Sequence, residues 1–167
     1  MKNLLYLLFV LLLSIKLSAQ DITPDMFVRT KNTGANMTIG INSPDFDQFA
    51  GGQIGAFYDL NGNDQFDLLP YPSNSNVTEC VGLTQITEGF MGLALWGNDS
   101  STPNLDGLPL GAVPQYAILH NGNVIRVQEI PQFTGYVTNG VVWMNDVVFY
   151  GGIGCTDPYA CNTMFMY

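Results

Sequence analysis

Asn-Gly dipeptides constrain the fold of this chain more than any other feature, because few residue pairs can form a two-residue hairpin loop. Both loop positions need positive φ, which Asn and Gly adopt at the lowest cost. Of the chain's three Asn-Gly dipeptides, two lie between apolar runs, and the first of these is Asn121-Gly122. It predicts an antiparallel hairpin whose apolar face is built by two cross-strand pairs, Tyr116 with Val127 and Ile118 with Ile125.

The second dipeptide, Asn139-Gly140, lies between two further apolar runs. By the same argument it predicts a second antiparallel hairpin. Val137 then lies opposite Val142, and Tyr136 lies opposite Trp143 as a cross-strand aromatic pair.

The rest of the chain consists of short apolar runs separated by Gly, Asn and Pro turns. Alternating or β-rich segments predict further strands at 37–41, 53–58, 79–86, 90–96 and 147–150. After residue 19, no segment combines a helical apolar period with capping residues and freedom from Gly or Pro. The predicted fold class is therefore all-β, an antiparallel β-sandwich of roughly seven to nine strands, with a jelly-roll-like or open-barrel topology as the alternative.

One of these segments, 90–96, has apolar residues on both faces. Met91, Leu93 and Leu95 share one face, while Phe90 and Trp96 share the other with the small residues between them. This pattern predicts a central strand that is covered on both sides, since small residues leave room for a neighbouring element.

The first 19 residues have the features of a secretory signal. Lys2 is followed by an apolar block, and a small residue, Ala19, stands at the expected cleavage position. The alternative is an uncleaved anchor, but the apolar block is shorter than the about 20 residues that cross a bilayer. We therefore expect a secreted or cell-surface chain, not membrane-spanning after cleavage, with a signal at 1–19, a β-sandwich at 20–150 and a tail at 151–167.

The chain carries 14 acidic and 5 basic residues among 167, and its formal charge is −9. The basic residues are scattered along the chain, and cleavage of the signal removes two of them. A row of phosphates needs several clustered basic side chains, so nucleic acid is not an expected partner. An acidic surface suits solubility and divalent cations.

An acidic segment at 59–67 places oxygen-bearing side chains at alternate positions. Ca²⁺ needs six to eight oxygen ligands, and a tight Asx-rich turn can supply several. The segment departs from the EF-hand pattern, because its sixth position is not Gly and its twelfth is Pro70. The candidate calcium ligands are Asp59, Asn61, Asn63, Asp64 and Asp67, and the alternative is an ordinary Asx turn with solvated acids.

Two of the three cysteines, Cys155 and Cys161, stand close together in the tail. In an exported protein such a pair predicts a disulfide, and no spacing in the chain supports zinc. Cys80 falls within a predicted strand, where it is either a lone buried thiol or the partner of a tail cysteine.

The tail sequence GCTDPYACN, at 154–162, resembles a short cysteine-containing repeat of secreted and cell-surface proteins from gliding bacteria that use type IX secretion. The resemblance covers nine consecutive positions and ends at Asn162, after which the expected continuation and its later cysteine are absent. The tail is therefore interpreted as a truncated or vestigial repeat.

The body also looks like the β-rich module that accompanies such repeats. The matching segments are NMT at 36–38, GQIGAF at 52–57, CVG at 80–82, LWGNDS at 95–100 and DGL at 106–108. The resemblance implies an extracellular module within a multi-part surface protein. It implies no catalytic residue, because none is assigned to the module.

The sequence offers little support for an enzyme. It lacks a nucleophile elbow, a phosphate loop and a His-rich metal motif, and His120 is the only histidine. Carboxylates that a glycan-active hydrolase would need are present, but their spacing does not indicate a catalytic pair. The candidates are Asp45, Asp47, Glu79, Glu88 and Asp99. We therefore expect no catalytic activity.

Two non-catalytic functions are compatible with the sequence. One is adhesion or structural spacing at the cell surface, with a surface polysaccharide or another extracellular protein as partner. The other is a carbohydrate-binding module, because aromatic rings on a β-scaffold stack against sugar faces. The candidate ligand-binding residues are Trp96, Asn98 and Asp99, although aromatics at strand positions more often pack in a core.

Overall fold

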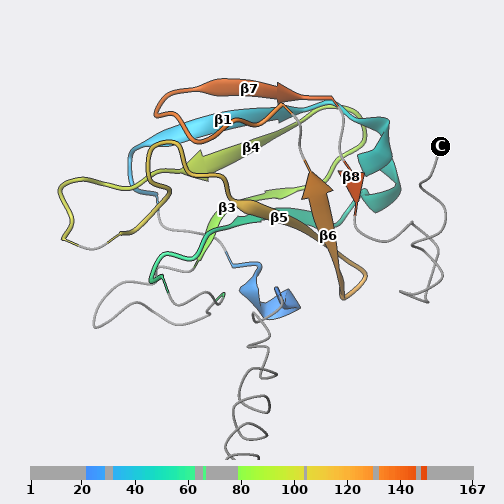
Figure 1. Ribbon diagram of the computed structural model, residues 1–167. Helices are drawn as coiled ribbons and strands as arrows, with labels where there is room; N and C mark the ends of the chain where they lie inside the picture. The colour runs from blue at the N-terminus through green and yellow to red at the C-terminus, as the bar shows by residue number, and fades with distance from the viewer. Residues whose placement is uncertain are drawn as a thin grey trace, which may run out of the picture.

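The computed structural model describes residues 22–28, 32–62, 66, 79–103, 105–129, 132–145 and 148–149. In these residues, eight strands form two sheets packed face to face (Figure 1). They are β1 (Asn36–Ile41), β2 (Gln53–Phe57), β3 (Cys80–Gln85), β4 (Met91–Trp96), β5 (Gln115–His120), β6 (Asn123–Glu129), β7 (Val141–Met144) and β8 (Val148–Phe149). The predicted signal and the cysteine tail lie outside the described residues.

The first sheet has three strands in the order β4-β1-β7. β1 and β4 are antiparallel, with Ile39 opposite Leu93, and they direct alternate residues to the interior. β1 and β7 are parallel, with Gly40 opposite Trp143. This parallel pair departs from the wholly antiparallel arrangement that the sequence predicts.

The second sheet has five strands in the order β3-β2-β5-β6-β8. All its pairs are antiparallel. The predicted hairpin between β5 and β6 is confirmed, with Tyr116 opposite Val127 and Ile118 opposite Ile125. Its loop residues Asn121 and Gly122 have φ of 50° and 77°, as a two-residue hairpin of this kind requires.

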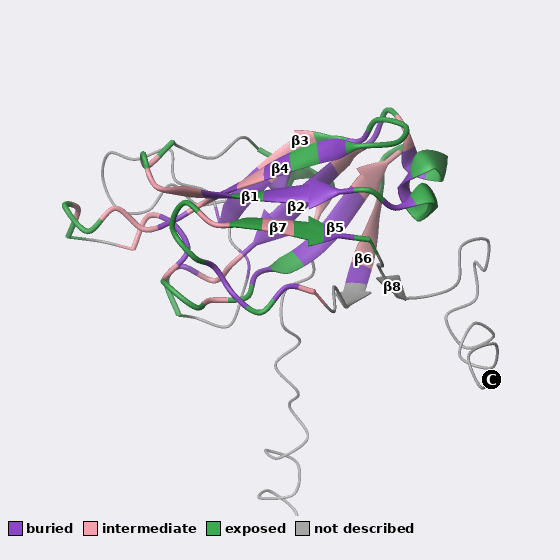
Figure 2. Cartoon of the chain, turned by 90° about the horizontal axis from the view of Figure 1, so that it is seen from above, coloured by how far each residue is buried: buried purple, intermediate pink, exposed green. Residues whose placement is uncertain are grey.

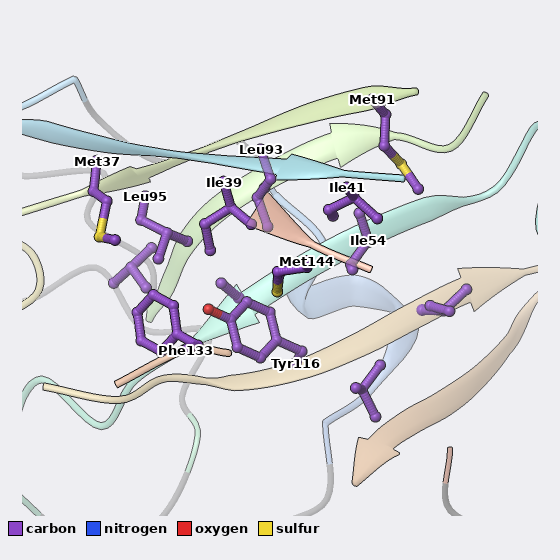
Figure 3. Packing of buried hydrophobic residues seen from close by; sticks show 14 of the residues in the cluster. Met37, Ile39, Ile41, Ile54, Met91, Leu93, Leu95, Tyr116, Phe133 and Met144 are labelled. Carbon is purple, nitrogen blue, oxygen red and sulfur yellow. The ribbon is translucent and has the colours of Figure 1, made fainter. Parts of the chain in front are cut away.

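The main hydrophobic core lies between the two sheets. Figure 3 shows apolar side chains of β1 and β4 pointing across the interior toward Ile54 of β2 and Tyr116 of β5. Ile39, Leu93 and Ile118 are completely buried. Truncating such a side chain to Ala typically costs about 2–5 kcal/mol of unfolding free energy. The alternation read from the sequence therefore places these residues correctly in the core.

Helical structure in the described part of the chain is limited to two short 3-10 segments, η1 (Pro24–Met26) and η2 (Pro44–Phe49). η2 buries Phe46 and Phe49 at one end of the sandwich. η1 covers the outer face of the five-stranded sheet (Figure 1). There Phe27 packs edge-on against Phe57 with ring centroids 5.1 Å apart. Within the described residues, no helix is long and apolar enough to span a membrane.

The prediction of a hairpin at Asn139-Gly140 is wrong. Of the two residues only Asn139 has positive φ, and the Gly140 N–H closes a turn onto the Val137 carbonyl at 2.9 Å. The segment after the turn joins β1 in parallel, because the Thr38 N–H donates to the Gly140 carbonyl at 2.9 Å. The main-chain groups after Gly140 therefore bond to the open edge of β1 instead of to a hairpin partner.

The predicted aromatic pair of Tyr136 and Trp143 is also not formed. The main chain of Tyr136 bonds to the loop after β4, where its N–H donates to the Ala112 carbonyl and its carbonyl accepts from the Gly111 N–H, both at 2.8 Å. Its ring is buried in the core, whereas Trp143 stays exposed on the outer face of the other sheet. Burial of the Tyr136 ring in the core takes precedence over the cross-strand pair.

The prediction of β4 as a central strand is wrong as well. β4 is an edge strand of its sheet, and β1 lies at the centre. The inward positions are correct, since Met91, Leu93 and Leu95 are buried. The outward positions are not covered, because Phe90 and Gly92 are exposed and a Cβ at Gly92 would meet no atom within 4 Å. The small residues therefore border an open surface instead of a neighbouring layer.

The fold class predicted from the sequence, an all-β sandwich, is confirmed. Among the described strands the two sheets stay separate and are not closed into a continuous barrel. Their outer faces differ: η1 and Phe66 pack on the five-stranded sheet, whereas the exposed residues of β7 lie on the outer side of the three-stranded sheet (Figure 2).

Candidate functional site

The predicted calcium segment is described only in part. The Asp59 carboxylate accepts a hydrogen bond from the Gly62 N–H at 2.7 Å, which forms an Asx turn, and Asn61 is exposed. Asn63, Asp64 and Asp67 lie outside the described residues. The described residues contain no group of three or more His, Cys, Asp or Glu side chains that could hold a metal ion. The calcium site stays a prediction.

Glu79, which directly precedes β3, holds the start of this segment through hydrogen bonds. The residue is only 5% exposed, and its carboxylate accepts a hydrogen bond from the Leu60 N–H at 3.0 Å. Its carbonyl accepts from the Tyr58 N–H at 2.9 Å. These bonds satisfy main-chain donors at the point where β2 gives way to the loop. Among the carboxylates considered for hydrolysis, Glu79 therefore has a structural role in the described geometry.

The predicted ligand-binding residues Asn98 and Asp99 belong to a loop held together by its own side chains. The Asp106 N–H donates to the side-chain oxygen Oδ1 of Asn98 at 3.0 Å, and the Asp99 N–H donates to the Asp106 carboxylate at 2.9 Å. The Asp99 carboxylate accepts from the Ser101 N–H at 2.8 Å. Asn98 and Asp99 thus use oxygens that a ligand would otherwise contact, while Trp96 remains half-buried beside them.

A different set of residues forms an aromatic platform on the outer face of the three-stranded sheet. Phe90, just before β4, and Trp143, on β7, have ring centroids 5.3 Å apart and planes tilted by 41°. Each ring is 57% exposed. The two rings meet over β1, which lies between their strands. We call this pair the Phe90–Trp143 platform.

Gly40 of β1 forms the floor of this platform. A Cβ at Gly40 would lie 2.8 Å from Cε3 of Trp143 and 3.2 Å from Cε2 of Phe90. Both rings can therefore approach the sheet only because this position carries no side chain. The adjoining Gly92, opposite Gly40 in the register, borders open space. The platform thus has a flat, accessible border along β4.

The surface around the platform is neutral. The remaining outward positions of the three strands, judged by alternation and register, are occupied by Asn36, Thr38, Val141, Ala94 and Trp96. Val141 is largely exposed, as is the Thr38 side chain. None of these outward positions carries a charged side chain.

A polar pocket of about 460 Å³ lies at one end of the five-stranded sheet. The amides of Gln53 and Gln85 line it together with His120 and Asn121. The His120 ring contacts Phe49 edge-on, with centroids 5.8 Å apart, so it is partly packed. The pocket holds hydrogen-bonding groups but no exposed aromatic ring, and we regard it as the weaker candidate for a recognition site.

Sequence reasoning missed Phe90 as a binding candidate and placed Trp143 in the wrong pair. The signal for the platform was nonetheless present, because Phe90 shares its face with Gly92 and Ala94. In a central strand, such small residues indicate that a neighbouring element packs over them. At an edge strand the same pattern indicates an open aromatic surface.

The predicted disulfide residues Cys155 and Cys161 lie outside the described residues. Cys80 is a free, buried thiol whose Sγ–H donates to the Gly82 carbonyl at 3.3 Å. Burial raises the pKa of the Cys80 thiol to about 12, while the hydrogen bond to Gly82 opposes part of this shift. Of the two alternatives for Cys80, the described structure shows the lone buried thiol.

Neither a protein-family model, nor a curated protein sequence, nor a solved structure matches this chain. Of the two described surfaces, the Phe90–Trp143 platform is the one that exposes two large aromatic side chains.

Proposed function

We propose that this chain is a secreted, non-catalytic module that acts in adhesion or another extracellular interaction at a bacterial surface. The observation that carries the proposal is the Phe90–Trp143 platform. Two aromatic rings exposed side by side on a neutral sheet face are costly in water, and exposed apolar patches usually mark interaction sites. The signal-like leader and the similarity of the tail to repeats of type IX-secreted proteins support an extracellular location.

Retention on cells tests this function. The chain from residue 20 is labelled with a fluorophore and added to whole cells of a gliding bacterium, and the bound fraction is measured after washing. Phe90→Ala combined with Trp143→Ala should reduce retention at least tenfold, because it removes both rings of the platform. The matched control is Leu110→Ala with Val113→Ala, which removes two exposed apolar side chains elsewhere. Equal retention of all three proteins would refute the proposed surface.

Calcium stabilisation of the 59–67 segment is part of the proposal, supported by the oxygen-rich spacing of its side chains. Ca²⁺ at ten times its Kd would stabilise the folded chain by about 1.4 kcal/mol, enough to raise Tm by a few degrees. Thermal unfolding with millimolar Ca²⁺, with Mg²⁺ as the control ion, measures this. An Asp59→Asn and Asp64→Asn double variant should lose the response. A rise below about 1 °C in the parent protein would remove calcium from the proposal.

A further inference from the structure

The Phe90–Trp143 platform has the shape and chemistry of a sugar-stacking surface. We propose that it binds a neutral polysaccharide chain, which names the partner class of the adhesive surface proposed above and rests on that proposal. Aromatic rings bind the apolar C–H faces of sugars, and the indole of Trp offers the largest ring of any side chain. The ring centroids, 5.3 Å apart, are separated by about the length of one sugar residue in an extended glycan.

The platform is already formed without a ligand. Phe90 and Trp143 touch each other, and both lie against Gly40 of the central strand. Side chains held by packing on strands lose little conformational freedom when a ligand arrives, so less binding free energy is spent on ordering them. The open space above Gly92 leaves room for a second sugar ring beside Phe90.

Groups suited to sugar hydroxyls stand near the rings. Asn42 follows β1 and Asn145 follows β7, and both residues are exposed. The ends of these two strands are joined by a hydrogen bond from the Asn42 N–H to the Met144 carbonyl at 3.0 Å. Thr38, also exposed, lies one outward position before Gly40. Amides and hydroxyls both donate and accept hydrogen bonds, as recognition of sugar hydroxyls requires.

The charge distribution selects a neutral glycan. Acidic residues stand at both ends of the face: exposed Glu88 precedes Phe90, and Asp47 accepts a hydrogen bond from the Gly89 N–H at 2.9 Å. Asp99 follows the Trp96 end. These carboxylates, together with the overall formal charge of −9, repel a polyanion that lies along the strands. A neutral chain meets no such repulsion.

The size of the platform favours a glycan over a second copy of the chain. An aromatic side chain buries roughly 150–250 Å² when fully covered, and each ring here already has part of its surface buried. A stable protein interface buries about 800 Å² on each partner. Two rings on a three-stranded sheet cover a narrow strip, which suits a single extended polysaccharide better than a protein surface.

Isothermal titration calorimetry of the chain from residue 20 tests the proposal with defined oligosaccharides. The neutral probes are cellohexaose, xylohexaose and mannohexaose, and the anionic probe is hexagalacturonate. We expect at least one neutral hexasaccharide to bind, and the anionic one to bind at least tenfold more weakly than the best neutral probe. Phe90→Ala and Trp143→Ala should each weaken that binding at least tenfold, while Leu110→Ala should leave it unchanged.

Gly40→Ala is a second variant that keeps both rings. The added methyl group would displace them from the sheet, so we expect a loss of at least threefold in affinity. Circular dichroism and urea unfolding check that each variant is folded. We expect Phe90→Ala and Trp143→Ala to fold because both side chains are exposed.

Several outcomes would overturn the proposal: no neutral probe binds, Trp143→Ala binds as the parent does, or the anionic probe binds best. Sedimentation velocity tests whether a second copy of the chain occupies the platform instead. A dimer that Trp143→Ala abolishes would assign the platform to that second copy. If the platform variants lose retention on cells but no glycan binds, the adhesive surface stands and the glycan proposal fails. If retention is unchanged while glycan binding is lost, the adhesive function fails instead.

Discussion

At the scale of the residue, Cys80 illustrates how burial controls the ionisation of a thiol. The thiol lies under the η1 cover with Phe57 and Ala117, and burial raises its pKa from 9.0 to about 12. The thiolate is the reactive form of cysteine, so the native chain keeps this sulfur inert near neutral pH. This inertness is consistent with the prediction that Cys155 and Cys161 pair with each other in an exported chain.

The raised pKa predicts a loss of stability at alkaline pH. Below pH 9 the thiol is protonated in both states, so it contributes no pH dependence. Between pH 9 and about 12 only the unfolded state releases the proton, and the unfolding free energy should fall by up to about 1.4 kcal/mol per pH unit. Burial also raises the pKa of Tyr116, which adds a second alkaline contribution.

Urea unfolding from pH 8 to 11 in the parent and in Cys80→Ala separates the two contributions. We expect a shallower decline in the variant, with the residual slope arising from tyrosines. Identical slopes in both proteins would show that Cys80 does not carry the effect. A Cys155→Ser and Cys161→Ser background keeps the tail thiols out of the titration.

At the scale of the element, the Asn-Gly dipeptides at 121–122 and 139–140 show what local sequence can predict. The hairpin at Asn121-Gly122 was predictable because its partner strands are adjacent in the chain and both faces agree with the register. The pairing of β7 with β1 joins segments about a hundred residues apart, and no local signal encodes it. The same dipeptide therefore produced two outcomes, according to whether a distant strand edge competed for the main chain.

The β5–β6 hairpin depends on Gly122, whose φ is 77°. Gly122→Ala forces a Cβ into the left-handed region, so we expect a loss of about 1–2 kcal/mol in unfolding free energy. Gly92→Ala is the matched control, because it lies in a strand without positive φ and its new methyl group meets no atom within 4 Å. Urea unfolding of both variants gives the comparison, and an equal effect on the two would contradict the argument from backbone conformation.

The Phe90–Trp143 platform, too, could be predicted only in part from local sequence. Residue alternation placed Phe90, Gly92 and Trp96 on one face of a strand, which the structure confirms. Their exposure depends on β4 being an edge strand and on Trp143 arriving from β7. Neither fact can be derived from periodicity within one segment, since strand order is set by packing between distant segments. The platform is therefore a property of topology, although each of its residues lies within a predicted strand.

At the scale of the whole molecule, the two outer faces of the sandwich are treated differently. η1 lays Ile22, Met26 and Phe27 over the five-stranded sheet and buries a second apolar cluster there. The three-stranded sheet instead presents the exposed Phe90–Trp143 platform. Under the proposed function, the covered face contributes to stability and the exposed aromatic face contributes to recognition.

This separation predicts that stability and binding respond to different substitutions. Phe27→Ala removes the ring that packs on Phe57 from the covered face, so we expect a loss of about 3–5 kcal/mol in unfolding free energy. Phe27→Leu, which keeps most of the volume, should lose less than half as much.

Because the platform lies on the other sheet, the cell retention of Phe27→Ala, measured under conditions where this variant is folded, should match that of the parent. Trp143→Ala should show the converse, with retention lost and a smaller loss of about 1 kcal/mol in unfolding free energy from the broken aromatic contact with Phe90. If Phe27→Ala abolished retention while remaining folded, the two faces would be coupled and the platform would not act alone.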